Sequence, residues 1–187
     1  MSSGIQKGST KNNGAGVSTK SQISENIHEK IISDSVNTVF GFNPKKWSFR
    51  KDLPVSYLTK IQHGWGINKK GKSTIVKSDG YFILYDNKLV GVTEHKQQGK
   101  EGNACERFYK YIAYASIWDL EPWQIFGSFT GDGFHKPVKG ISGGGQTGAT
   151  IETLLAYGAT VVTNPDEKEL ENSSVIWLER IAKKYES

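Results

Sequence analysis

Apolar side chains are nearly absent from residues 1–21 and then appear at a regular spacing. Isoleucines recur every four residues from Ile23 to Ile31, and further apolar residues follow at helical spacing. This pattern predicts an amphipathic helix that ends near Gly41. The polar stretch before the helix cannot bury enough apolar surface to offset its ordering entropy, so we expect residues 1–21 to be a disordered basic arm and residues 22–187 to form a single domain.

In the middle of the chain the hydrophobic pattern changes to that of β-strands. Residues 78–96 contain two β-rich runs separated by Asp86 and Asn87, which are strong turn residues, and therefore predict a β-hairpin. A turn centred on that pair places Asp79 directly opposite Glu94. Because like charges so close together repel, we expect a cation between the two carboxylates.

The rest of the chain alternates between helical and extended patterns. In chain order, it predicts loops or short strands over 42–77, a helix from the N-cap Asn103 to about Trp118, a strand over 123–129, a glycine-rich loop over 131–148, a helix over 151–157, a strand over 159–163, an acidic linker over 164–172 and a last helix over 175–185. Strands and helices that alternate in this way predict an α/β fold with a mixed sheet.

Charge is distributed unevenly over the 187 residues. Residues 1–77 contain thirteen Lys and Arg against four Asp and Glu, within a net charge of +5 for the whole chain. A basic part of this kind is expected to attract phosphate, either of nucleic acid or of an acidic membrane surface, although it also favours plain solubility.

Cysteine and histidine content limits the possible chemistry. A single cysteine, Cys105, excludes an internal disulfide, and four scattered histidines leave no Cys/His metal site, so any metal must be held by oxygen. No apolar run approaches the ~20 residues of a membrane span, and no signal-peptide pattern begins the chain. We therefore expect a cytoplasmic protein.

The hairpin carries three side chains that suit metal-assisted phosphodiester hydrolysis. Asp79 and Glu94 offer the carboxylate oxygens that Mg²⁺ prefers, and Lys96 lies two residues after Glu94, so both project from one face of the strand. An ammonium there can orient the attacking water or offset charge on the phosphate. By itself, however, Glu-x-Lys is common, and a solvated pair on an edge strand is the plain alternative.

Three segments carry a resemblance to a known family. KSDG (residues 77–80), EHKQQGKE (94–101) and GNACERFYK (102–110) resemble the motifs of the EcoRI/MunI-like type II restriction endonucleases, which belong to the PD-(D/E)xK nuclease superfamily. The third segment is the most specific of these. Weaker similarity continues in IFGSFTGDGF (125–134) and LLAYGATVVTN (154–164), so the resemblance extends over about residues 76–164.

The resemblance implies a restriction-endonuclease-like fold, with a central mixed sheet flanked by helices, and roles for matching residues. Asp79, Glu94 and the backbone carbonyl of His95 would bind Mg²⁺, and Lys96 would complete the catalytic set. DNA contacts would come from Lys77, Lys100, Asn103, Ala104, Glu106, Arg107 and Lys110. The implied protein is a homodimer that cuts double-stranded DNA at a palindrome containing AATT, alongside a companion methyltransferase that acts on the same site.

The chain departs from the family pattern at Ser78, where proline is usual, and at His95, where a small or apolar residue is usual. We expect the His95 side chain to face away from the site as a core histidine, with a titratable helper as the second reading. The connection from Lys96 to Gly102 is shorter than in EcoRI, which leaves the outer bases of the target open. Two other functions remain alternatives: a repair or junction-resolving nuclease of the same superfamily, and a non-catalytic DNA-binding module.

Overall fold

The computed structural model describes residues 25–41, 45–54, 75–97, 115–116, 118–130 and 145–187, without the side chains of 25, 54, 75–77, 79 and 145–150. The basic arm predicted over 1–21 lies outside these residues. So does most of the helix predicted after Asn103.

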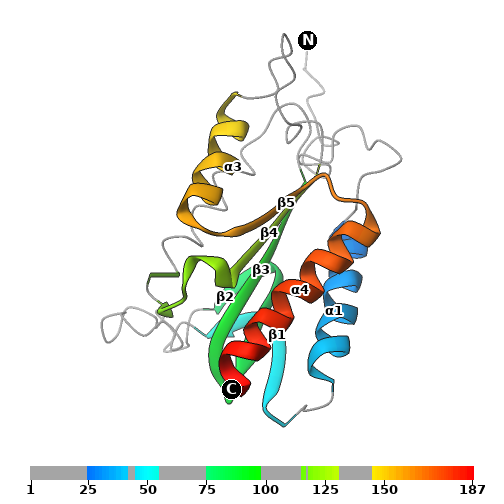
Figure 1. The fold of residues 1–187 in the computed structure, drawn as a ribbon, viewed down its shortest axis with the longest axis vertical. Helices are drawn as coiled ribbons and strands as arrows, with labels where there is room; N and C mark the ends of the chain where they lie inside the picture. Colours follow the sequence, from blue (N-terminus) through cyan, green and yellow to red (C-terminus); the bar gives the residue numbers. More distant parts are fainter. Residues whose placement is uncertain (1–24, 42–44, 55–74, 98–114, 117, 131–144) are drawn as a thin grey trace, which may run out of the picture.

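The described strands form one five-stranded mixed sheet (Figure 1). They are β1 (Trp47–Pro54), β2 (Ile75–Tyr85), β3 (Lys88–Gln97), β4 (Ile125–Thr130) and β5 (Thr160–Thr163). The strands lie side by side in chain order, antiparallel from β1 to β3 and parallel from β3 to β5. The prediction of an α/β fold with a mixed sheet is confirmed. A strand, β1, occupies part of the region for which loops or short strands are expected.

Helices cover both faces of this sheet. Helices α1 (Glu25–Phe40) and α4 (Glu167–Glu186) lie side by side on one face, and α3 (Gly145–Tyr157) lies on the other (Figure 1). The face under α1 and α4 is closed by a core that includes Ile32, Val36, Phe126, Trp177 and Ile181. The opposite face packs Phe82, Val92, Trp118, Phe129 and Leu154. Among the described helices, none is both long enough and apolar enough to cross a membrane.

Two helices begin earlier than their patterns predict. Helix α4 begins at Glu167 and includes residues predicted to be an acidic linker, because the Asp166 side chain accepts a hydrogen bond from the Glu169 amide at 2.7 Å. Acidic residues in a first turn also interact favourably with the helix dipole. Helix α3 begins at Gly145, inside the segment predicted to be a glycine-rich loop.

Strands β2 and β3 form the predicted hairpin. The φ angles of Asp86 and Asn87 are 47° and 62°, the left-handed conformation that a two-residue type I′ turn requires. Next to the turn, Tyr85 pairs with Lys88 and Leu84 with Leu89, which is the register that a turn centred on this pair predicts.

A β-bulge then shifts the pairing of the two strands. Beyond it Ile83 pairs with Gly91 and Phe82 with Val92. This register is one residue out of step with the uniform pairing that the prediction assumed. The described pairs end at Phe82 and Val92, so the pairing of Asp79 with Glu94 stays a prediction. A turn determines register only while both strands stay regular, and an extra residue in one strand moves every later pair.

Candidate functional site

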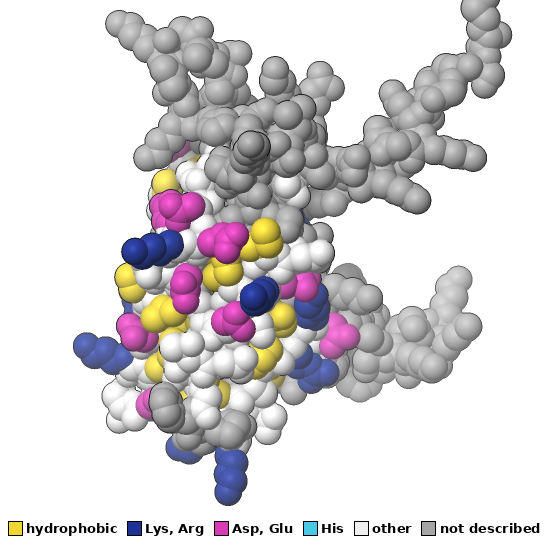
Figure 2. Space-filling view, turned by 90° about the vertical axis from the view of Figure 1, so that its right-hand side faces the viewer, with side chains coloured by type: hydrophobic (Ala, Val, Ile, Leu, Met, Phe, Trp, Pro, Cys, Tyr) yellow, Lys and Arg dark blue, Asp and Glu magenta, His cyan; other side chains and the backbone are white. Residues whose placement is uncertain are grey.

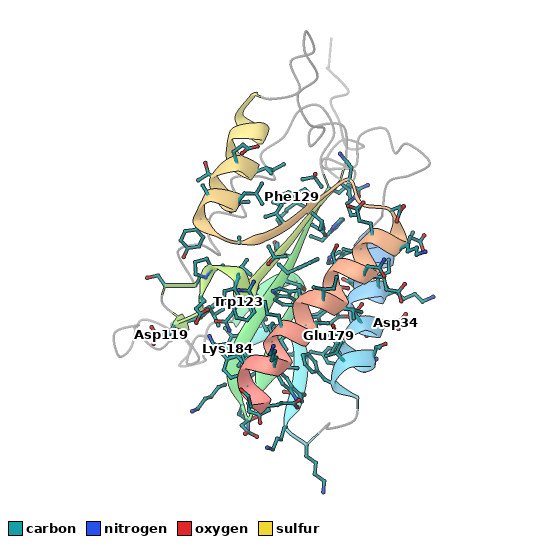
Figure 3. All side chains as sticks on the ribbon, in the orientation of Figure 1. Asp34, Asp119, Trp123, Phe129, Glu179 and Lys184 are labelled. Atoms are coloured by element: carbon teal, nitrogen blue, oxygen red, sulfur yellow. The ribbon has the colours of Figure 1, made fainter. Side chains whose placement is uncertain are left out.

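The Glu-x-Lys motif lies near the carboxyl end of the central strand. Glu94 pairs with Gly127 of the parallel strand β4, and Lys96 pairs with Phe129, which marks this end of β4 in Figure 3. Because β3, β4 and β5 are parallel, their carboxyl ends meet at one edge of the sheet. Ligands of open α/β sheets bind at this edge. The alternative of a solvated pair on an edge strand is wrong.

Glu94 and Lys96 form a buried ion pair. Glu94 is 0% exposed and Lys96 is 5% exposed, and the Lys96 ammonium contacts Glu94 Oε1. The other carboxylate oxygen, Oε2, accepts a hydrogen bond from Ser78 Oγ at 2.8 Å. Both carboxylate oxygens thus have a partner, which offsets part of the cost of removing the charge from water.

The Ser-Asp-Gly segment of β2 lies very close to β3 at this point. Ser78 Oγ lies 2.5 Å from the carbonyl oxygen of Thr93, and the Gly80 amide donates to the same hydroxyl at 3.0 Å. The Tyr81 amide donates to Thr93 Oγ1 at 2.7 Å. A Cβ on Gly80 would lie 2.6 Å from the carbonyl oxygen of Thr93 and still closer to the Thr93 hydroxyl. The two strands can therefore lie this close together only with glycine at position 80.

His95 lies on the other face of β3. Its ring stacks on that of His28 in α1, with 4.4 Å between ring centroids, and its Nδ1 lies 2.8 Å from Ser128 Oγ. Burial, followed by the charge of His95, lowers the pKa of His28 well below its usual value. The prediction of a core histidine that faces away from Glu94 is confirmed.

The donors at this edge suit a hard cation. Glu94 contributes a carboxylate, and main-chain carbonyls are oxygens of the kind that Mg²⁺ accepts. Among the side chains that the structure describes, no three His, Cys, Asp or Glu residues gather in a metal-binding group. The side chain of Asp79 is not one of those described, although its backbone lies in β2 between Ser78 and Gly80.

The side chains expected to contact DNA lie outside the described residues: those of Lys77, Lys100, Asn103, Ala104, Glu106, Arg107 and Lys110. Of these residues, Lys77 alone has a described backbone, which pairs with Asp52 of β1. The sequence prediction missed two described neighbours of the motif, Ser78 and His28. The sequence held one signal that could have pointed to Ser78: it has a hydroxyl at a position where the family pattern has proline.

The first turns of α4 carry an excess of acidic side chains. Figure 2 shows acidic and basic side chains interspersed over the side of the molecule that α1 and α4 form. The first turns of α4 expose Asp166, Glu167, Glu169 and Glu171. Their charge repels phosphate, so this end of α4 does not favour a polyanion.

No protein-family model matches the chain, and no curated protein or solved structure is similar enough to indicate a relationship. The resemblance to restriction endonucleases therefore rests on the short motifs. Function has to be argued from those motifs and from the geometry around Glu94.

Proposed function

We propose that this protein is a type II restriction endonuclease, which hydrolyses double-stranded DNA at a palindrome containing AATT with Mg²⁺ as its cofactor. One observation carries the proposal: the buried Glu94/Lys96 ion pair, hydrogen-bonded to Ser78, at the carboxyl end of the central strand. The same residues supply the Glu-x-Lys of the resemblance. The mixed sheet with helices on both faces is compatible with a restriction-endonuclease-like fold.

A buried ion pair is a poor structural element, which favours a chemical role for this one. Removing two charges from water costs several kcal/mol per ion, and apolar side chains of similar volume are often as stable or more so. Elsewhere β3 packs apolar residues, such as Val90 and Val92, into the two cores. A charged pair at the ligand-binding edge of the sheet is better explained by function than by packing.

The residues of the motif have two proposed roles: some would bind the metal ion, and Lys96 would act on the attacking water and the phosphate. Glu94, Asp79 and the backbone carbonyl of His95 would hold the metal ion. When bound, Mg²⁺ polarises a phosphoryl oxygen and lowers the pKa of a bound water. The Lys96 ammonium, placed beside the Glu94 carboxylate, orients the attacking water and offsets the negative charge that develops on the phosphate.

Recognition of DNA is assigned to the segment that follows β3. Asn103, Ala104, Glu106 and Arg107 read base edges in the major groove, and the surrounding lysines contact phosphates. A palindrome presents the same half-site twice, so a homodimer with a two-fold axis fits it. The acidic first turns of α4 then face away from the DNA.

The function is tested by digesting linear DNA of known sequence with the 187-residue chain in the presence of Mg²⁺. We expect discrete fragments whose ends map to one palindrome containing AATT, and no cutting when EDTA removes the metal. No Mg²⁺-dependent cutting of any DNA would overturn the proposal. Cutting of branched or damaged DNA alone would indicate a repair or junction-resolving nuclease instead.

The catalytic assignment is tested by Lys96→Ala. Loss of this ammonium should lower the cleavage rate by about 10²-fold or more, the usual contribution of a positioned catalytic group. Lys184→Ala is the matched control, because Lys184 also forms an ion pair, with Glu121 at 2.7 Å, but lies on the surface (Figure 3). The control should cut DNA at the wild-type rate, and circular dichroism should show both variants folded. Normal cutting by Lys96→Ala would remove the mechanism.

A further inference from the structure

We propose that Ser78 is a positioning residue, which holds the Glu94 carboxylate and the backbone of Asp79 in the arrangement that binds the metal ion. This inference rests on the proposed function and identifies a further residue on which that function depends. The family pattern has proline at this position, which has no hydroxyl.

Ser78 has hydrogen-bond partners on both strands. Its hydroxyl accepts from the Gly80 amide at 3.0 Å, and its single proton lies between two acceptors, Glu94 Oε2 at 2.8 Å and the Thr93 carbonyl oxygen at 2.5 Å. Ser78 is only 7% exposed, so bulk water does not compete for these contacts. The hydroxyl is therefore fixed by its surroundings.

The first consequence concerns the direction of the Glu94 carboxylate. A glutamate has three rotatable side-chain bonds, and a metal ligand must be held in one orientation. Lys96 contacts Oε1, and Ser78 donates to Oε2 from the opposite strand. These two contacts act on different oxygens, so together they restrict rotation of the carboxylate more than either contact would alone.

The second consequence concerns Asp79, which lies between Ser78 and Gly80 in β2. The Ser78 hydroxyl accepts a hydrogen bond from the Gly80 amide, which follows Asp79, and shares its one proton between the Thr93 carbonyl oxygen and Glu94 Oε2 of β3. The short distance from Gly80 to Thr93 holds the same segment against β3. A proline restricts this backbone through its ring, whereas serine restricts it through hydrogen bonds. Serine in place of proline thus restricts the backbone by hydrogen bonds instead of by a ring, and it adds a contact to Glu94.

The test compares Ser78→Ala, which removes the hydroxyl, with Ser78→Thr, which keeps it. The matched control is Ser174→Ala, because Ser174 is a fully buried serine whose hydroxyl lies 2.7 Å from that of Ser35, in the contact between α1 and α4. Mg²⁺ affinity is measured by isothermal titration calorimetry on the 187-residue chain without DNA. The Mg²⁺ dependence of DNA cleavage is measured on the same preparations.

We expect Ser78→Ala to bind Mg²⁺ about 10- to 100-fold more weakly, as loss of a group that orients a metal ligand usually does. Its cleavage rate should fall most at low Mg²⁺ and recover in part at saturation. Ser78→Thr should restore wild-type affinity, and Ser174→Ala should not change it. A merely structural role would instead lower stability without changing Mg²⁺ affinity.

Two failures can be told apart. If wild-type protein binds Mg²⁺ and cuts DNA but Ser78→Ala binds Mg²⁺ equally well, or if Ser174→Ala weakens binding to the same extent, the role of Ser78 is overturned and the proposed function stands. If wild-type protein neither binds Mg²⁺ nor cuts DNA, the proposed function fails and the role of Ser78 fails with it.

Discussion

Replacing Lys96 by methionine tests whether Glu94 is a buried charge that depends on its partner. Methionine keeps an unbranched apolar side chain of similar length and removes the ammonium. Because Glu94 is 0% exposed, water cannot take the place of that ammonium. Ser78 remains as a neutral hydrogen-bond donor to Oε2. The variant should therefore fold with a carboxylate that is only partly compensated.

The expected loss of stability follows from the burial of the pair. Removing one member of a buried ion pair costs about 3–5 kcal/mol. Because the hydrogen bond from Ser78 persists, and a bond to a charged group contributes about 1.5–3 kcal/mol, we expect the lower end, about 3 kcal/mol. For a domain of this size that loss corresponds to a fall in Tm of about 6–12 °C. The double variant Glu94→Gln/Lys96→Met removes the remaining charge and should regain most of the loss.

The assay is urea unfolding without Mg²⁺, followed by the fluorescence of the five tryptophans. It compares the wild type, Lys96→Met, Glu94→Gln and the double variant. Lys184→Met is the control, because its exposed ion pair should contribute no more than about 1 kcal/mol. The reasoning would be refuted by a Lys96→Met variant as stable as the control. It would equally be refuted if the losses of unfolding free energy in the two single variants simply added up in the double variant. Additive losses would mean that Glu94 and Lys96 do not interact.

Two further measurements test other parts of the site. Gly80→Ala should destabilise the fold by about 1–3 kcal/mol, because its Cβ would meet the main chain of Thr93, and an unchanged melting temperature would contradict the close approach of the strands. His28 has a folded pKa well below its ordinary value of 6.5, so the unfolded chain binds more protons below that pH. Stability should therefore be fully present above about pH 6.5 and be lost as the pH falls towards the folded pKa. When urea unfolding is measured at several pH values, the free energy of unfolding of His28→Leu should fall less steeply over that window than that of the wild type. An unchanged dependence on pH would count against a buried neutral His28.

Much of the secondary structure was predictable because it depends on neighbouring residues. The isoleucine spacing that begins at Ile23 predicted helix α1, and the Asp86-Asn87 pair predicted the turn between β2 and β3. The start of α4 was missed because charged residues are typical of both linkers and first helical turns. In the structure, the Asp166 side chain caps that helix.

The candidate site was predictable only in part. The Glu-x-Lys motif is visible in the sequence, and alternation along a strand places Glu94 and Lys96 on one face and His95 on the other. The change of register between Ile83 and Leu84 was missed, because no local pattern indicated the bulge there. The contact of Ser78 with Glu94 was not predicted either, because it depends on how β2 lies against β3.

The sequence by itself determined most of the helices and strands apart from the starts of α3 and α4, which side chains are available for chemistry, and which of them share a face of β3. Periodicity and turn chemistry act over a few residues, so one stretch of chain is enough to express them. Only the tertiary structure decided that Glu94 and Lys96 are buried in a central strand, that Ser78 bonds Glu94, and that His28 stacks on His95. These contacts join residues far apart in the chain, and they depend on how the sheet aligns its strands and packs against α1.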